Sequence, residues 1–197
     1  MLQATQKRAQ KTRERILEAA EHMFETSRFD AVSTEAIAEA ANVSKGTIFA
    51  HFTDKLGLLA EVGLRDLDVR LEELEKRLSE AQADCDTEEE IINVIAQFLN
   101  YFEKQPYFLR LFIDEAGWKQ SAKAEMFDKL VLRQQQLLTA WVELGQKQGT
   151  IRVADPCILG SALRAFLLHV SIGRVCGEST CQAEQMVQLR ELVSVLL

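Results

Sequence analysis

Apolar side chains recur at intervals of three and four residues along most of this chain, the spacing that gathers them on one face of an α-helix. Within residues 12–27 the positions that follow this spacing are Ile16, Leu17, Ala20, Met23 and Phe24. The segment 27–33 breaks the pattern, and Ser33 and Ser44 are then placed to cap two short helices, TEAIAEAA and KGTIFAHF. The pattern predicts three helices within about the first 52 residues.

A long fourth helix is expected to begin at Lys55, with Asp54 as its cap. Its apolar stripe is formed by Leu56, Leu59, Gly63, Leu67, Leu71, Leu74 and Leu78. At 1.5 Å per residue, about 25 residues span roughly 35–40 Å, which is enough to link two domains. We therefore interpret residues 55–80 as a connector helix.

Five more helices are predicted after the polar segment 84–87. They are a helix with Ile91, Ile95, Phe98 and Phe102, a helix opened by Pro106, a helix from about Ala122 to Lys147 that ends at Gly149, a helix that starts at Asp155-Pro156, and one over about residues 182–196. Only two prolines and nine glycines interrupt the chain. The predicted fold class is all-α, with about nine helices.

The net charge of -7 is unevenly distributed. The first 15 residues contain a single acidic residue, Glu14, and five basic ones, Lys7, Arg8, Lys11, Arg13 and Arg15. Residues 1–52 hold seven basic and seven acidic residues, so the whole negative charge falls on residues 53–197. A basic end on an acidic protein suits contact with DNA at that end, although a solvated basic terminus has the same composition.

Residues 33–55 have the features of a helix-turn-helix. The small side chain of Ala38 allows the second helix to cross the first closely. Asn42 occupies the turn position that most often demands a positive φ, which asparagine tolerates better than most residues. Val43 and Ile48 are then expected to point inward, where Ile37 meets them.

The exposed first turn of the second helix, formed by Lys45, Gly46 and Thr47, is expected to meet base edges in the major groove. Lysine and threonine can donate to base acceptors, and glycine lets the backbone come near the DNA. His51 and Lys55 lie further along, where phosphates would pass, and Lys55 stands at a helix start whose free amides attract an anion. A short helical hairpin that serves stability alone is the alternative.

At these residues the sequence resembles the tetracycline-repressor (TetR) family of bacterial one-component regulators, over residues 12–60. The matching positions are Ile37-Ala38, the run Asn42-Val43-Ser44-Lys45-Gly46-Thr47-Ile48-Phe49-Ala50-His51-Phe52, and Lys55 with Leu56, Leu58 and Leu59. Asn42 replaces the usual glycine, and Phe49 replaces a tyrosine whose hydroxyl usually reaches a phosphate. The resemblance implies that DNA is contacted by Ser33, Thr34, Ser44, Lys45, Gly46, Thr47, Phe49, His51 and Lys55.

The resemblance also implies two domains, a helix-turn-helix DNA-binding domain over residues 1–54 and a helical ligand-binding and dimerisation domain over residues 55–197. The residues on helices that the family arranges around its ligand are Phe98, Phe102, Phe108, Phe112, Trp118, Phe127 and Trp141. A cavity lined in this way takes a largely apolar small-molecule effector. Each aromatic residue taken singly more often fills a packed core than lines a ligand site.

Residues 156–173 contain one charged residue, Arg164, and a helix that is apolar nearly all round must be buried nearly all round. We therefore expect a homodimer through helices at about 156–174 and 182–196. The final helix would contribute Leu189, Leu192, Val193 and Leu196 to a four-helix bundle. A central helix in a monomer is the alternative.

The four cysteines, Cys85, Cys157, Cys176 and Cys181, include no C-x-x-C pair, so no zinc site and no disulfide framework is expected. A reducing cytoplasm is implied, and neither a metal nor a cofactor is expected. A redox switch at Cys176 and Cys181 is an open alternative. Because Arg164 and His169 interrupt the most apolar stretch, we expect no membrane association.

These features predict a ligand-responsive, sequence-specific regulator of transcription, most simply a repressor that an inducer releases from a palindromic operator by shifting the connector helix. An activator with the same contacts would have the same sequence features. An all-α enzyme is disfavoured, because the three histidines lie far apart and the chain has no E-x-x-H, G-x-S-x-G or phosphate-binding glycine loop. A helical architectural dimer without sequence-specific DNA binding is a further alternative.

Overall fold

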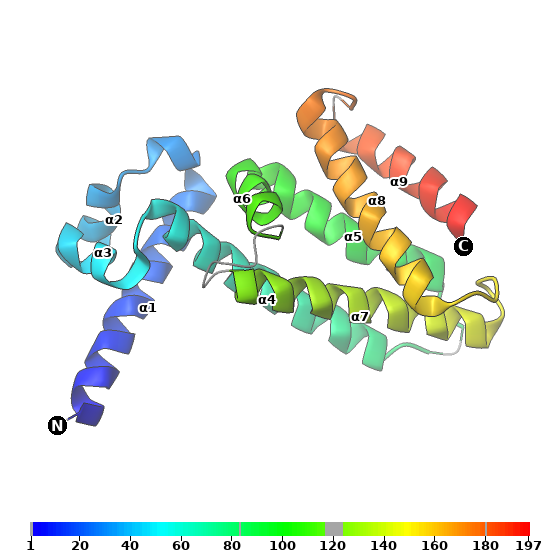
Figure 1. The fold of residues 1–197 in the computed structure, drawn as a ribbon, viewed down its shortest axis with the longest axis horizontal. Coiled ribbons are helices and arrows are strands. Elements are labelled where there is room, and N and C mark those ends of the chain that lie inside the picture. The colour runs from blue at the N-terminus through cyan, green and yellow to red at the C-terminus, as the bar shows by residue number, and fades with distance from the viewer. Residues whose placement is uncertain (1, 83, 117–123, 180) are drawn as a thin grey trace. The chain divides into compact units, whose positions relative to one another are not determined.

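The computed structural model describes residues 2–82, 84–116, 124–179 and 181–197 (Figure 1). Its elements are α1 (Leu2–Thr26), the 3-10 turn η1 (Phe29–Ala31), α2 (Thr34–Ala40), α3 (Lys45–Phe52), α4 (Lys55–Ser79), α5 (Thr87–Lys104), α6 (Pro106–Ala116), α7 (Ala124–Gln148), α8 (Pro156–Cys176) and α9 (Gln182–Leu196). Over these described ranges the chain forms nine α-helices and no strand. The predicted all-α class is confirmed.

Three predicted capping residues accept hydrogen bonds from the free amides of the helices that they begin, namely Ser33 for α2, Ser44 for α3 and Asp54 for α4. Asp155 caps α8 in the same way. The hydroxyl oxygen lies 3.0 Å from the accepted amide nitrogen at Ser33 and 3.1 Å at Ser44. These caps fix where both helices of the helix-turn-helix begin.

Two local features differ from the predicted pattern. Helix α1 begins at Leu2, because residues 2–11 are good helix formers that carry no apolar stripe for periodicity to detect. Leu56, which was predicted on the buried stripe of α4, is 44% exposed. It lies in the first turn of α4, where no preceding turn of the helix is available for its side chain to pack along.

The described residues gather into two compact units. The head unit comprises Met1–Asp66 and Tyr107–Asp114, and the body unit comprises Leu67–Pro106 and Glu115–Leu197. The division falls inside α4, so this helix contributes about its first three turns to the head unit and the rest to the body unit. The sequence contains no signal that most of α6 joins the head unit.

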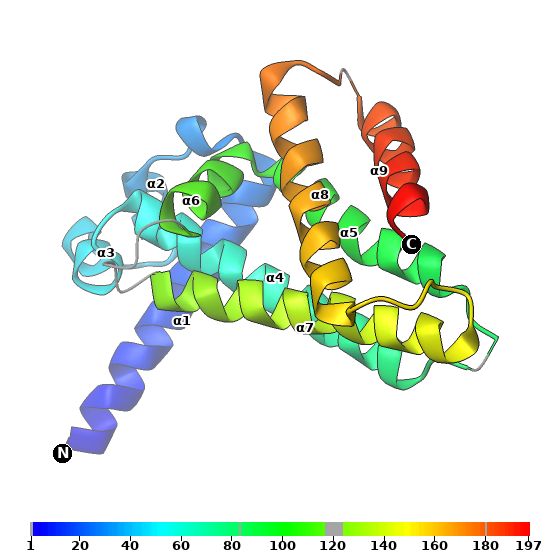
Figure 2. The same cartoon turned by 45° about the vertical axis from the view of Figure 1, so that its right-hand side comes forward.

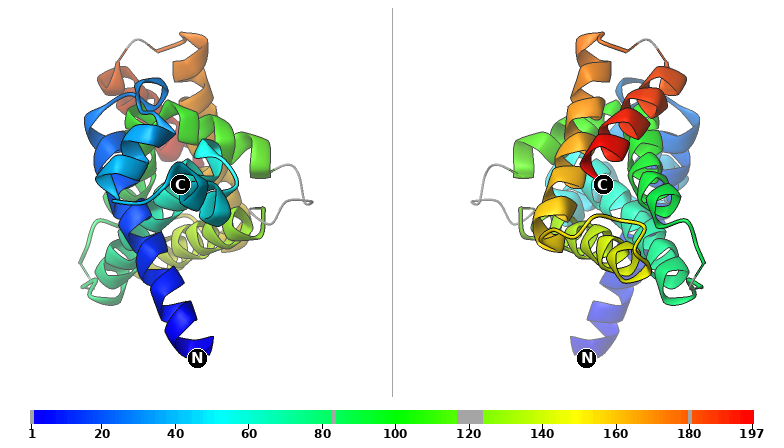
Figure 3. Two further views of the ribbon diagram at one scale, coloured as in Figure 1. Left: turned by 90° about the vertical axis from the view of Figure 1, so that its left-hand side faces the viewer. Right: turned by 90° about the vertical axis from the view of Figure 1, so that its right-hand side faces the viewer.

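Within the body unit, α5 contacts α7, α8 and α9, and α8 packs along both α7 and α9. Figures 2 and 3 show α8 and α9 lying side by side as a helical hairpin. Leu189 and Val193 on α9 are completely buried within this single chain. These two residues therefore pack in the core of their own unit, and the predicted homodimer through α8 and α9 stays a prediction.

Helix α8 is long and apolar enough, by length and composition alone, to cross a membrane. Part of its apolar surface is covered by α7 and α5, and Arg164 in its middle donates from Nε to the side-chain oxygen of Gln135 at 3.2 Å. The large apolar residues that remain exposed on α8 are Ile158, Ile172 and Val175. One face of α8 is therefore core and another is an uncovered apolar surface.

Candidate nucleic-acid interface

The interior of the helix-turn-helix in the head unit is tightly packed. Ile37 from α2 and Ile48 from α3 are fully buried, Phe52 is nearly so, and α2 contacts both α1 and α3. Ala38 is also buried where α2 and α3 cross, as its small side chain predicted. Val43 is half-buried, so it contributes less to this core than Ile48 does.

Asn42 adopts a φ of 51° in the turn between α2 and α3, as predicted. In this left-handed conformation its amide bonds to the carbonyl of Glu39 at 3.0 Å, and the next amide, that of Val43, returns to the carbonyl of Ala38 at 2.9 Å. These bonds satisfy carbonyl groups at the end of α2 and redirect the chain into α3.

The first turn of α3 is presented to solvent. Lys45 and Gly46 are exposed, whereas Thr47 is half-buried with its hydroxyl 2.8 Å from the hydroxyl of Ser44. A Cβ atom added to Gly46 would meet only the hydroxyl of Ser44, at an ordinary contact distance of 3.7 Å. Nothing inside the protein therefore requires glycine at this position, which is consistent with a surface that another molecule approaches closely.

The side chain of Lys45 is held by an acidic neighbour. Its ammonium group donates to the carboxylate of Glu35, in the first turn of α2, and lies 5.8 Å from the ring centre of Phe49. The hydrogen bond from Lys45 lowers the pKa of Glu35. Phe49 is itself 43% exposed, an unusual position for a large aromatic ring. The sequence contained no indication of the pairing between Lys45 and Glu35.

Lys55 is turned toward the interior of the head unit. Its ammonium group donates to the backbone carbonyl of Phe29 and lies 4.0 Å above the ring of that residue. Burial lowers the pKa of Lys55, and the nearby charge of Asp30 opposes that shift. The predicted phosphate contact at this side chain therefore competes with an internal role, which is to hold η1 against the start of α4.

All nine residues predicted to contact DNA lie in the head unit, between the cap of α2 and the first residue of α4. The hydroxyl of Ser33 is engaged as a cap, and the hydroxyl of Thr34 donates to the carboxylate of Glu35 at 3.0 Å. His51 is half-buried beside Phe52. Among the nine residues, the exposed ones are Ser33, Ser44, Lys45, Gly46 and Phe49, and all but Ser33 lie on α3 or at its cap.

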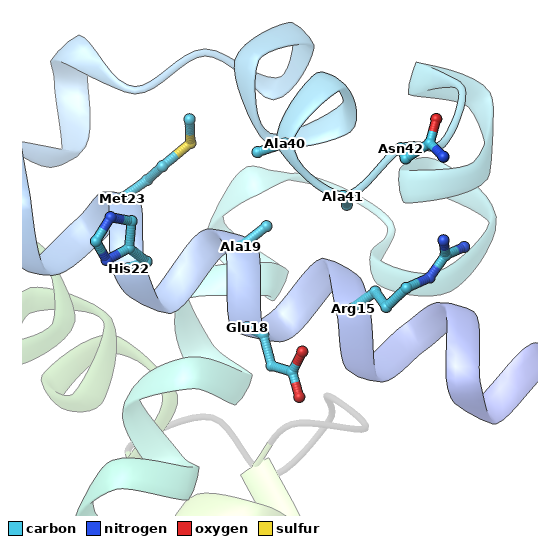
Figure 4. Close-up of a pocket in the computed structure, with 8 residues that line it drawn as sticks. All are labelled: Arg15, Glu18, Ala19, His22, Met23, Ala40, Ala41 and Asn42. Carbon is cyan, nitrogen blue, oxygen red and sulfur yellow. The ribbon is translucent and has the colours of Figure 1, made fainter.

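A groove of about 450 Å³ opens on the head unit between α1 and the end of α2 (Figure 4). Its lining residues are Arg15, Glu18, Ala19, His22, Met23, Ala40, Ala41 and Asn42. Arg15 from α1 and Asn42 from the turn lie at the same end of this groove. The sequence indicated the basic character of this end of the chain but not the groove.

The seven aromatic residues predicted around an effector are not gathered in one unit. Phe98, Phe102, Phe127 and Trp141 are buried in the body unit, Phe108 and Phe112 are buried in the head unit, and Trp118 lies outside the described residues.

The body unit instead contains two buried hydrogen-bond donors on α7. The indole nitrogen of Trp141 and the side-chain nitrogen of Gln134 have no hydrogen-bond acceptor among the residues that the structure describes. The two residues are seven apart, so they share one face of α7. This pair was not predicted from the sequence.

Sequence comparison relates the head unit to known regulators. Residues 16–62 match the profile described as "Bacterial regulatory proteins, tetR family". The HTH-type transcriptional regulator YhgD of Bacillus subtilis (strain 168) is 26% identical over 142 residues, which cover 72% of each chain. The HTH-type transcriptional regulator UidR of Escherichia coli (strain K12) is 38% identical over 66 residues, only 34% of each chain.

Solved structures share the whole fold. A protein of Mesorhizobium loti described as a TetR-family transcriptional regulator superposes with a TM-score of 0.67 at 24% identity, covering 96% of both chains. The transcriptional regulator FadR of Bacillus subtilis, in complex with stearoyl-CoA, superposes with a TM-score of 0.66 at 15% identity, covering 93% of this chain and 96% of that one. At these identities the likeness concerns the fold.

Proposed function

We propose that the chain is a member of the tetR family of bacterial regulatory proteins, and that it is a repressor that binds a palindromic operator as a homodimer and is released by a small-molecule inducer. The observation that carries the proposal is the exposed first turn of α3. Lys45 and Gly46 face solvent on a helix-turn-helix whose interior is closed by buried Ile37 and Ile48.

The first turn of α3 has the chemistry to read base edges in the major groove. Lys45 can donate to guanine acceptors once it leaves Glu35, and Gly46 lets the backbone approach the bases. Exposed Phe49 offers an apolar contact in place of a hydroxyl, for example to a thymine methyl group. Ser33 and Thr34 stand at the start of α2, where they would meet a phosphate.

A second copy of the chain is the proposed partner of the exposed apolar face of α8. Ile158, Ile172 and Val175 on α8 and Val187 and Val195 on α9 are exposed in the single chain. Pairing two copies about a two-fold axis would cover these residues in a four-helix bundle. Such a dimer presents two heads, which a palindromic operator requires. The protein would act in the cytoplasm.

The effector is proposed to bind in the body unit. Gln134 and Trp141 on α7 are buried donors that lack acceptors within the described structure, and buried donors are normally paired. A largely apolar molecule with acceptor oxygens would pair them. The FadR protein of similar fold binds stearoyl-CoA, so long-chain acyl compounds are the first class to test.

We propose that effector binding in the body unit releases the protein from the operator by moving α4 and α6. Helix α4 contributes residues to both units, and Tyr107–Asp114 of α6 belong to the head unit although the chain on either side of them does not. An effector that shifts the body-unit part of either helix would therefore change the position of the recognition helices and the match to two half-sites.

Fluorescence anisotropy with the DNA upstream of its own gene and a random duplex of equal length tests the proposal. We expect the upstream DNA to bind at least about 10³-fold more tightly than the random duplex at physiological salt. The double variant Lys45→Ala, Thr47→Ala should lose most of that preference. Equal affinity for the two duplexes would exclude operator reading and favour the architectural alternative.

A further inference from the structure

Several basic residues of the head unit are already used inside it. Arg13 pairs with Glu61, Lys45 with Glu35 and Arg65 with Glu14, while Lys55 donates to the carbonyl of Phe29. Arg13 also lies 4.5 Å above the ring of Phe52. A phosphate that approached any of these cations would have to displace an existing partner, which reduces the affinity that the contact can contribute.

Arg8, Lys11 and Arg15 on α1 are in the opposite situation. All three side chains are exposed, and within the described part of the chain none has a carboxylate within 4.0 Å. They follow one another at intervals of three and four residues, so they form one stripe over about 10 Å of helix. Glu14, three residues from Lys11, pairs with Arg65, and Glu18, three residues after Arg15, is the acidic residue on the same face.

The stripe leads to the reading end of α3. Arg15, its last member, lines the groove of Figure 4 at the same end as Asn42, and Asn42 stands two residues before Ser44, the cap of α3. The groove wall between them is made of small side chains, those of Ala19, Ala40 and Ala41. Small side chains at this point leave room for a backbone to lie close to the helices.

We propose that Arg8, Lys11 and Arg15 bind the phosphodiester backbone of duplex DNA next to the bases that α3 reads, and supply a major part of the salt-dependent affinity. The inference rests on the proposed function, since it takes the α3 turn as the reading surface. When unpaired cations on a rigid helix bind phosphate, no ion pair has to be broken and no segment has to fold, so neither process reduces the affinity. The carboxylate of Glu18, further along the groove, limits the stripe to the end that faces Asn42.

The salt dependence of DNA binding tests this assignment directly. The full chain and the variants Lys11→Ala, Arg15→Ala and the double variant are titrated with upstream DNA and with random duplex, between about 0.05 and 0.3 M KCl. Because the proposed homodimer carries two copies of each residue, each single substitution is expected to reduce the slope of log K against log salt by about 1.8 and to weaken binding about tenfold to a hundredfold on both duplexes. Arg15→Lys, which keeps the charge, should retain the wild-type slope.

Lys147→Ala is the matched control, because Lys147 is an exposed cation on α7 of the body unit. Its slope should equal that of the wild type. If Lys11→Ala and Arg15→Ala change the slope no more than Lys147→Ala does, or weaken only the binding of upstream DNA, the stripe is a solvated face and the proposal is overturned. Equal wild-type affinity for both duplexes would end the proposed function, whereas the slopes on random duplex would still decide the role of the stripe.

Discussion

The hydroxyl of Tyr107 donates a hydrogen bond to the carboxylate of Asp30, so the first turn of α6 is fastened to η1, just before the helix-turn-helix. The ring of Tyr107 lies 4.9 Å from that of Phe29, measured between ring centres. The ammonium group of Lys55 lies over the ring of Phe29, 4.0 Å from the ring centre. One cluster therefore joins α6, η1 and the start of α4 within the head unit.

Replacement of Tyr107 with phenylalanine keeps the ring contact and removes the hydrogen bond. The hydrogen bond to Asp30 raises the pKa of Tyr107 above its ordinary value. A raised folded-state pKa means that the stabilisation is fully present below the unfolded-state pKa, about 10, and is lost as pH rises through the folded-state pKa. The melting temperature of the wild type should therefore fall more steeply than that of Tyr107→Phe above about pH 9.5. Parallel curves over that range would exclude the contribution of this bond.

Glu35→Gln is expected to strengthen DNA binding. The carboxylate of Glu35 holds Lys45 in the free protein and places a negative charge beside the surface that we propose to meet DNA. Because Lys45 lowers the pKa of Glu35, the pair is ionised at neutral pH and must be broken for Lys45 to reach a base. Removal of the charge should raise affinity about threefold to tenfold at low salt, as measured by anisotropy.

Glu39→Gln is the control for this effect, since Glu39 is an exposed carboxylate on the same helix and the substitution changes the net charge equally. It should raise affinity by less than Glu35→Gln. An equal gain from both variants would show that overall charge, and not the release of Lys45, governs the result.

The turn at Asn42 predicts opposite results for two substitutions. Glycine adopts a φ of 51° without strain, so Asn42→Gly should leave the free energy of unfolding within about 0.5 kcal/mol of wild type. A β-branched side chain is strained in this region, so Asn42→Val should cost about 1–2 kcal/mol. Urea unfolding of both variants measures the difference. A stable Asn42→Val protein would contradict the assigned backbone conformation.

The sequence could predict what depends on neighbouring residues along the chain. The caps at Ser33 and Ser44, the positive φ of Asn42 and the burial of Ile48 each follow from local spacing and backbone sterics. The pairing of Lys45 with Glu35 depends on how α2 and α3 cross, and no spacing rule specifies which of several acidic residues a lysine meets.

Other features escaped prediction because they depend on distant segments. The contact between Tyr107 and Asp30 joins residues 77 positions apart, and nothing in either local sequence marks it. Leu189 and Val193 were expected in a bundle with a partner subunit, but an apolar stripe records burial and not what covers it. Both residues are already buried within their own unit in the single chain.

Gln134→Leu should stabilise the protein in the absence of effector. The side-chain nitrogen of Gln134 is buried without an acceptor among the described residues, so leucine of similar size removes an unpaired donor. The free energy of unfolding should rise by about 1 kcal/mol, and the melting temperature by about 2–4 °C. Its neighbour supplies the control: Gln135 accepts a hydrogen bond from Arg164, so Gln135→Leu should destabilise. Destabilisation by Gln134→Leu would mean that its nitrogen has a partner.

Ile172→Asp should separate the proposed homodimer into monomers. Ile172 is 43% exposed on the uncovered face of α8, so an aspartate there is tolerated by a single folded chain. In a two-fold interface the substitution places two unpaired carboxylates in an apolar environment, at a cost of several kcal/mol for each buried charge. Sedimentation velocity should therefore show a dimer for the wild type and a monomer for the variant, with operator affinity lost in parallel. Leu132→Asp, which alters an exposed apolar residue of α7, should leave the dimer intact, and an equal effect of the two variants would place the interface elsewhere.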